Sequence, residues 1–107
     1  MISLEEFKKI ELKVAKIIEV KEHPQADKLY VLKVNTGNEI KQLVAGIRKF
    51  YTPQQLLNKN IVIINNLQPA MIRGIESQGM LLAASDTNNN ISLILPDKDI
   101  APGSTIR

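Results

Sequence analysis

The sequence predicts an all-β domain folded as a small closed sheet. Apolar and polar residues alternate with a period of two in several segments, and Gly, Pro, Asn and Asp separate these segments. Only two short stretches begin with helix-capping residues. With 107 residues, of which 44% are hydrophobic, the chain can bury one core but not two. We therefore expect a single domain that spans residues 1–107.

The first expected element is a short helix at about residues 4–9. Ser3 and Glu6 have the spacing of a capping box, in which each side chain accepts a hydrogen bond from the other residue's backbone amide. Such a short helix is not stable alone, so it must dock on another surface. A second subunit is one candidate for that surface.

Residues 11–21 are expected to form a long, half-buried strand. Leu12, Val14, Ile18 and Val20 alternate and are expected to share its apolar face. The segment 23–27, His-Pro-Gln-Ala-Asp, ends the strand, because a proline cannot donate to the hydrogen-bond ladder.

Two shorter strands and a second helix are expected next. The strands cover residues 29–34 and 40–47 and are joined by a hairpin-type turn at residues 35–38. Thr52, Pro53 and Gln55 then form a helix start, with a helix that should end at Leu57 or Asn58.

The stretch 65–84 is expected to follow one buried strand, residues 61–64, and to end in another, residues 80–84, with a long polar connection between the two. Gly74 and Gly79 are expected where the backbone bends sharply or another segment approaches closely. Ser77 lies in a polar run and is expected to be exposed. Met80 has two possible roles, as core packing or as an apolar contact in a groove. Two interpretations remain open for the polar side chains of this stretch: they bind an anionic polymer, or they only face water.

The C-terminal third is expected to add a turn at residues 85–90, a strand at 91–95 and a last extended piece after Pro102-Gly103. The order of elements is then one helix, three strands, a short helix and further strands. This order is typical of the OB-fold, a five-stranded barrel with a small helix between strands 3 and 4. The strands after residue 80 would extend the barrel or contact a second copy.

The composition gives no sign of catalysis or of a metal or cofactor site. The chain has no cysteine, no Gly-x-Ser-x-Gly elbow and no phosphate-binding loop. Its one histidine, His23, precedes a proline and is expected to be a turn residue rather than a general base. The chain also lacks a membrane-spanning apolar segment and a secretory apolar core, so we expect a cytoplasmic protein with no membrane partner.

The charge distribution indicates a polyanionic partner. The net charge is +3, but residues 28–73 contain seven Lys or Arg and only one acid, Glu39. Lys33 and Lys41 are expected on polar strand positions, with other cations at the strand ends. Such a segment favours nucleic acid, although cations spread around a barrel would only make it soluble. Because aromatic residues make up only 4% of the chain, the composition favours recognition of a folded RNA by its shape and backbone over wrapping of a single strand.

Five motifs in order resemble those of the tRNA-binding domain family. This family includes the C-terminal domain of methionyl-tRNA synthetases, freestanding tRNA-binding proteins, the endothelial-monocyte-activating polypeptide domain and a secretion-chaperone-like branch. The similarity extends from about Phe7 to Arg107. The motifs occupy residues 10–14 (IELKV), 23–29 (HPQADKL), 42–47 (QLVAGI), 66–69 (NLQP) and 73–80 (RGIESQGM).

The resemblance implies an OB-fold that binds tRNA by its structure and forms a homodimer through its terminal extensions. It would act either as a freestanding protein or as the C-terminal module of a methionyl-tRNA synthetase, with the synthetase as a partner. The alternative is a chaperone-like, peptide-binding member of the family. The positions expected to contact RNA are Lys28, Lys41, Arg48, Asn66, Arg73, Ser77 and Met80.

Two departures from the family pattern suggest modest affinity. Ala70 and Met71 stand where relatives often carry basic residues, and Lys13 and Lys41 stand where they often carry arginine. Lysine can hold a phosphate but lacks the bidentate fork of arginine. Dimerisation could compensate by avidity.

Overall fold

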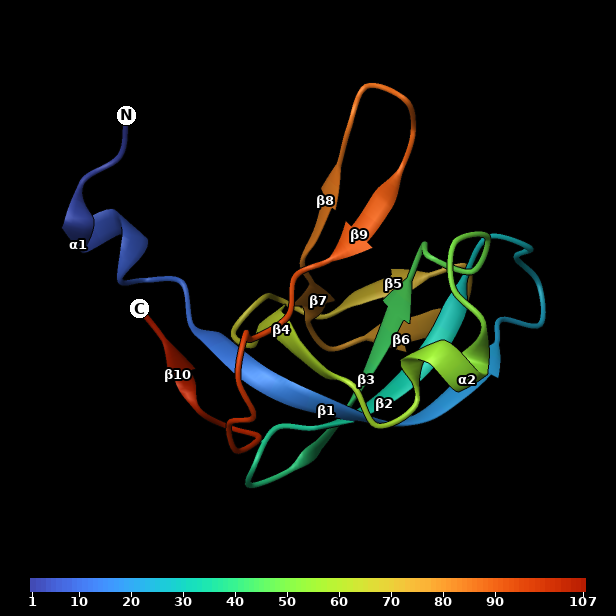
Figure 1. Ribbon diagram of the computed structural model, residues 1–107, viewed down its shortest axis with the longest axis horizontal. Coiled ribbons are helices and arrows are strands. Elements are labelled where there is room, and N and C mark those ends of the chain that lie inside the picture. Colours follow the sequence, from blue (N-terminus) through green and yellow to red (C-terminus); the bar gives the residue numbers. More distant parts are fainter.

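A long central strand organises the structure, a computed structural model that describes all 107 residues. This strand, β1 (Leu12–Glu22), is paired antiparallel with β2 (Tyr30–Asn35) and with β4 (Asn60–Ile64). The sheet has the order β3-β2-β1-β4-β7, where β3 is Ile40–Ala45 and β7 is Met80–Leu81. Figure 1 shows β1 as the long curved strand that runs through the barrel.

The sheet closes into a barrel through two glutamines. The Gln78 backbone amide donates to the Gln42 carbonyl over 2.7 Å, and the Gln42 amide donates to Gln78 Oε1 over 2.8 Å. These bonds cover the free edge of β3, so the sheet has no long exposed edge there. The predicted five-stranded OB-like barrel is therefore confirmed. Its core is made of buried apolar residues that come mainly from β1, β2, β3 and β4, including Ala15, Ile17, Leu32, Val34, Leu43, Ile61 and Ile63.

The face of β1 that packs on the core differs from the prediction. The register shifts between Ile17 and Glu19, as a β-bulge does, so side chains beyond this point change faces. Before the shift Ala15 and Ile17 face the core, after it Val20 packs against the core, and Ile18 at the shift is 38% exposed. The prediction that Leu12 and Val14 share one face with Ile18 and Val20 is therefore wrong, because a simple period of two cannot represent an inserted residue.

Both predicted helices are present, and each is shorter than expected. α1 spans Leu4–Phe7 and α2 spans Pro53–Leu56, and both start with the predicted capping box. α2 buries Leu56 against the barrel, whereas α1 buries no residue. Figure 1 shows α1 standing away from the barrel, on the same side as the C-terminal strand β10 (Thr105–Ile106). Neither helix has the length and apolar character needed to cross a membrane.

The stretch 65–84 is not the long connection predicted from its polar residues. It contains a hairpin of β5 (Ala70–Ile72) and β6 (Ile75–Ser77), followed by β7 and by β8 (Ala83–Ser85), which pairs with β9 (Ile91–Leu93). Strands β3 and β9 also end two residues earlier than predicted.

Two glycines in this stretch have the predicted backbone roles. Arg73 and Gly74 form the tip of the β5–β6 hairpin with φ of 52° and 87°, and positive φ at both positions is what a type I′ turn needs. At Gly79, a Cβ atom would lie 2.8 Å from the Ile64 carbonyl oxygen. Only glycine allows β7 to approach β4 this closely.

Candidate nucleic-acid interface

The loop before β2 is held in place by its histidine. His23 is 3% exposed, and its Nδ1 accepts a hydrogen bond from the Gln25 amide over 3.0 Å. Nε2 therefore carries the ring proton and donates to the Ile72 carbonyl at 3.2 Å. This bond connects loop 23–29 to strand β5. The prediction that His23 is a structural turn residue is confirmed.

Arg73 sits on the hairpin tip directly against this loop. It is exposed, and its Nη2 donates to the Gln25 carbonyl over 3.0 Å. A positive φ is unusual for arginine and costs on the order of 1 kcal/mol, which makes Arg73 a candidate functional residue. Arg73 borders a hollow of about 460 Å³ whose other walls come from the loop: Gln25, Ala26, Asp27, Lys28 and Leu29.

Arg48 supports the same loop but is largely occupied. Its Nη1 donates to the Ala26 carbonyl over 3.2 Å, and its Nη2 forms an ion pair with Glu22. The Arg48 backbone amide also donates to the Lys28 carbonyl. Arg48 therefore lies beside the hollow, with much of its charge balanced by Glu22.

Lys28 and Lys49 complete this basic surface. Both are exposed, neither is in an ion pair, and they border a second hollow next to the first. We refer to Lys28, Lys49 and Arg73 as the cationic rim. Lys49 is not among the predicted contact residues. Its adjacency to Arg48 was the signal that could have identified it.

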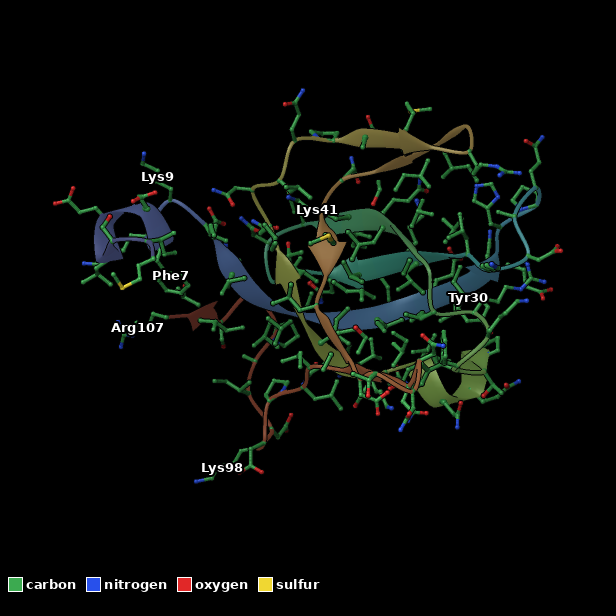
Figure 2. All side chains as sticks on the ribbon, turned by 90° about the horizontal axis from the view of Figure 1, so that it is seen from above. Phe7, Lys9, Tyr30, Lys41, Lys98 and Arg107 are labelled. Carbon is green, nitrogen blue, oxygen red and sulfur yellow. The ribbon has the colours of Figure 1, made fainter.

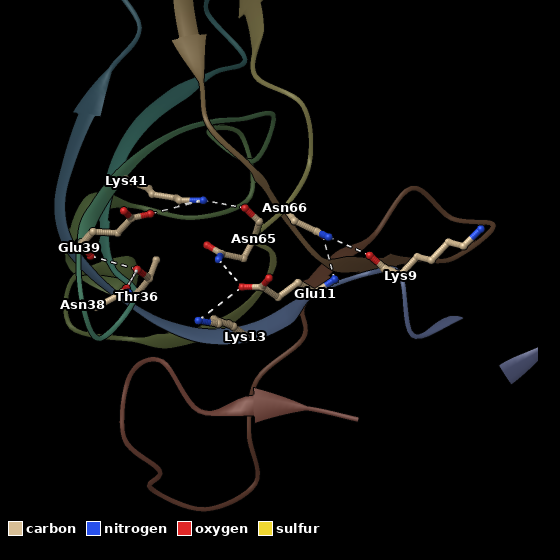
Figure 3. A network of polar contacts seen from close by, with 9 residues as sticks. All are labelled: Lys9, Glu11, Lys13, Thr36, Asn38, Glu39, Lys41, Asn65 and Asn66. Atoms are coloured by element: carbon tan, nitrogen blue, oxygen red, sulfur yellow. Dashed lines mark hydrogen bonds and ion pairs between the residues drawn. The ribbon is translucent and has the colours of Figure 1, made fainter. Parts of the chain in front are cut away.

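Lys41 lies at the end of β3 that is far from Arg48 and Lys49, and its side chain is on the core-facing side of the strand. It pairs with buried Val34, so it occupies the core-facing side of the strand rather than the predicted polar side. Its Nζ donates to the Asn65 carbonyl over 2.6 Å and lies 3.6 Å from Glu39 Oε1. Figure 3 shows this contact closing one end of the barrel.

Three further polar residues form a network next to Lys41 at this end of the barrel. Asn65 Nδ2 donates to Glu11 Oε1 over 2.7 Å, and Lys13 Nζ lies 3.4 Å from the same oxygen (Figure 3). The hydrogen bond from Asn65, with help from Lys13, lowers the pKa of Glu11 below its ordinary value of 4.5. We call Glu11, Lys13, Lys41 and Asn65 the polar plug.

Asn66 uses its side chain to hold the N-terminal segment. Its Oδ1 accepts from the Glu11 amide and its Nδ2 donates to the Lys9 carbonyl, each over 2.8 Å (Figure 3). Asn66 is thus an exposed residue whose amide is already engaged within the chain.

Ser77 is buried, contrary to the prediction that it would be exposed. Only 4% of the residue is accessible; its hydroxyl accepts from the Val44 amide and donates to the Gly79 carbonyl, both over 3.0 Å. This hydroxyl replaces a ladder bond where β6 leaves β3, which explains a polar residue at a core position.

Met80 is 45% exposed and lines an apolar groove rather than the core. The groove has a volume of about 280 Å³ and includes Val44, Leu67, Ile72 and Leu81. Of its two possible roles, the groove contact is the one that the structure favours.

The structure thus divides the predicted contact residues between several places. Lys28, Arg48 and Arg73 come together at the end of the barrel where β2 begins, whereas Lys41 lies at the other end. Figure 2 shows this separation through the labels of Tyr30 and Lys41. Asn66 is near Lys41, Ser77 is internal, and Met80 borders the apolar groove.

Comparison with known sequences places this geometry in context. The profile of the family described as "Putative tRNA binding domain" matches residues 12–105. The methionine–tRNA ligase of Pyrococcus horikoshii is 53% identical over 106 residues, which make up 99% of this chain but 14% of that protein. The ligase of Thermococcus onnurineus is 55% identical with the same coverage. This chain therefore spans only a small part of the curated relatives.

Solved structures match over the whole chain. A MetRS-related protein from Pyrococcus horikoshii superposes with a TM-score of 0.94 at 30% identity and covers 100% of this chain and 98% of that one. A CsaA chaperone protein from Picrophilus torridus superposes with a TM-score of 0.91 at 32% identity, with 100% of both chains covered.

Proposed function

Because the chain belongs to the tRNA-binding domain family, we propose that it binds tRNA by its folded shape, with the cationic rim against the sugar–phosphate backbone. The observation that carries this proposal is the convergence of Lys28, Lys49 and Arg73, three exposed cations from three separate loops. Asp27 is the one acid among the residues that line the two hollows. Cations grouped in this way release counterions when they meet phosphates, which favours binding of a polyanion.

The proposed role is capture of tRNA without chemistry of its own. The similarity to methionine–tRNA ligases supports a function beside or within such an enzyme. A module that holds tRNA raises the local concentration of tRNA at a nearby active site. We propose that this is how the chain assists aminoacylation, in the cytoplasm.

We propose in addition that the chain forms a homodimer through its terminal segments. Ile2 and Leu4 are 64% and 66% exposed, although a four-residue helix needs a surface to pack on. Phe7 and Ile106 line a hollow of about 260 Å³ beside this helix, and Figure 2 shows Phe7 next to the C-terminal Arg107. A second copy would cover these apolar groups, and Leu4→Glu should then yield a monomer in sedimentation analysis.

An experiment on tRNA binding tests the main proposal. Unfractionated tRNA is titrated into the protein at several salt concentrations, and we expect saturable binding whose log K falls by roughly 0.7 to 0.9 per log unit of salt for each phosphate contact. Arg73→Ala should weaken binding about tenfold with an unchanged melting temperature, since it removes one charge-assisted contact.

Lys98→Ala is the matched control, because it removes an exposed positive charge far from the rim (Figure 2). Equal losses in the two variants would show that only net charge matters. Absence of saturable binding by the unmodified protein would refute the proposed function.

A second candidate function is peptide binding in the apolar groove beside Met80. The groove is lined mainly by hydrophobic residues, and a chaperone protein is among the similar structures. Under this hypothesis, Met80→Asp abolishes binding of an unfolded, apolar peptide. If tRNA capture is the function, the same variant retains nearly full affinity for tRNA, because the groove carries no cation.

A further inference from the structure

We propose that the hollow beside Phe50 holds the base of one unpaired nucleotide of the bound RNA, with Lys28 and Lys49 at its phosphate. This inference rests on the proposed tRNA binding and adds to it a specific feature of the ligand, namely a base outside the double-helical stems. The hollow has a volume of about 300 Å³ and is lined by Lys28, Gly46, Lys49, Phe50 and Asn89.

The size and lining of the hollow fit one nucleotide. Small-molecule sites commonly have volumes of ~300–1,000 Å³, so this hollow is at the lower limit and has no room for a run of stacked bases. Its inner surface is mostly apolar, while two lysines stand at its edge. An apolar interior with cationic edges matches the two halves of a nucleotide, which are an aromatic base and an anionic phosphate.

Phe50 is the one aromatic side chain that is exposed. It is 45% exposed, whereas Tyr30 is buried and Phe7 and Tyr51 are half-buried. A single exposed apolar residue is ordinary in a folded protein, so exposure alone carries little weight. What indicates a nucleotide is that the ring lines the same hollow as two unpaired lysines, because bases stack on aromatic rings while cations hold their phosphates.

The turn that presents Phe50 is fixed from three sides. The Phe50 and Tyr51 amides both donate to the Ile47 carbonyl, over 2.9 and 3.2 Å. The Tyr51 hydroxyl accepts from the Leu93 amide of β9, and the Tyr51 carbonyl accepts from the Tyr30 hydroxyl of β2. The ring is therefore carried by a turn that is already ordered, which reduces the entropy lost on binding.

Asn89 provides a hydrogen-bonding group in the lining of the hollow. It lies in the turn between β8 and β9, where Asp86 Oδ1 accepts from the Asn88 and Asn90 amides at 2.9 Å each. The side-chain bonds of this turn involve Asp86, Asn88 and Asn90, so the Asn89 side-chain amide keeps its donor and acceptor atoms for a ligand. It can thus meet the polar edge of a base that lies flat on Phe50.

A fluorescence experiment tests this site directly. The chain contains no tryptophan, so Phe50→Trp introduces a single reporter at the proposed stacking position. We expect AMP and unfractionated tRNA to quench its emission, whereas ribose 5-phosphate, which lacks the base, should not. Equal quenching by ribose 5-phosphate and AMP would overturn the proposal, since the hollow would then bind only the anion.

Affinity measurements provide an independent test without a reporter. Phe50→Leu keeps an apolar side chain but removes the ring, and tRNA affinity should fall about tenfold, as expected for one lost base–aromatic stack. Phe50→Tyr keeps the ring and should bind tRNA nearly as well as the unmodified protein. Ile40→Ala is the control, because Ile40 is 61% exposed at the other end of β3.

The outcomes distinguish this inference from the broader proposal. If the unmodified protein binds tRNA, but Phe50→Leu binds equally well and Phe50→Trp is not quenched, the nucleotide site is refuted and tRNA binding stands. If the unmodified protein binds no tRNA, both proposals fail.

Discussion

The two ends of the barrel use lysine and arginine in opposite ways. At the end where β2 begins, Lys28, Lys49 and Arg73 are exposed and none of them is in an ion pair. At the other end, the Lys13 and Lys41 side chains are only 22% and 17% exposed, and both contact carboxylates. The cations at the first end are therefore free to bind a ligand, whereas those at the second end bind groups of the chain itself.

The difference shows that a positive charge in the sequence is not necessarily available for binding. Lys13 and Lys41 are mostly shielded from solvent, so a ligand cannot reach their charge without displacing the groups that they contact. Lys41 also donates to a backbone carbonyl, so a phosphate would have to replace two contacts at once. Arg48 is an intermediate case, because it supports the loop of the cationic rim while it is paired with Glu22.

The largest expected effect is on tRNA affinity, when two cations are replaced by neutral glutamines at one end of the barrel and, in a separate variant, at the other. Lys28→Gln with Arg73→Gln should reduce tRNA affinity on the order of a hundredfold at low salt, at about 1.4 kcal/mol for each lost contact. The salt dependence should become shallower by roughly 0.7 to 0.9 for each contact. Filter binding and urea denaturation should be measured on both double variants.

Lys13→Gln with Lys41→Gln is the matched double variant at the other end. It lowers the net charge by the same amount, but we expect it to lose stability and to keep most of its affinity for tRNA. If both double variants lost affinity equally, the assignment of the two ends would be wrong.

The next largest effect is expected at Ser77, which the structure places inside the barrel. Ser77→Ala removes a hydroxyl that accepts from the Val44 amide and donates to the Gly79 carbonyl. The free energy of unfolding should fall by about 1–3 kcal/mol, because two buried backbone groups lose their partner. Urea denaturation measures the loss. Unchanged stability together with weakened tRNA binding would instead make Ser77 a contact residue.

Local patterns predicted much of this fold, because they depend on neighbours in the chain. The capping boxes at Ser3 and Thr52 and the alternating burial of β2 are of this kind. The bulge that exposes Ile18, the closure of β3 by Gln78 and the reach of Lys41 to Asn65 depend on register between segments far apart. No local pattern reports that register.

The same reason explains why the candidate site was only partly predicted. Lys28 and Arg73 were correctly placed together because the resemblance supplied the motifs that contain them. Ser77 and Asn66 belong to those motifs too, yet their side chains bond to the protein itself. A motif contains residues that serve folding as well as residues that serve binding. Only the three-dimensional contacts distinguish these two kinds of residue.

A smaller effect is expected at Asn66, which connects the barrel to the N-terminal segment. Asn66→Ala removes its hydrogen bonds to the Glu11 amide and the Lys9 carbonyl. Trypsin should then cleave several-fold faster after Lys8 and Lys9, since local opening of this segment becomes easier while the barrel stays intact. Mass spectrometry of timed digests measures the rate. Gln54→Ala, at an exposed amide of α2, is the control and should leave the digestion pattern unchanged.

The smallest effect is a pH dependence that originates in the polar plug. The hydrogen bond from Asn65 lowers the pKa of Glu11 below 4.5 in the folded protein. Since the unfolded chain then binds the proton more readily, this contribution to stability is fully present above about pH 4.5 and is lost as the pH falls through the folded value. The Glu11 side chain is 43% exposed, so solvent screening keeps the effect small.

Urea midpoints measured from pH 7 to pH 3 test this link. Glu11→Gln should be less stable than the unmodified protein at pH 7, and the difference should shrink once Glu11 is protonated. Glu5→Gln, which removes a carboxylate of α1 that has no ion-pair partner, should run parallel to the unmodified protein throughout. A constant difference between Glu11→Gln and the unmodified protein at all pH values would mean that Glu11 contributes through packing. The polar plug would then not be held together by charge.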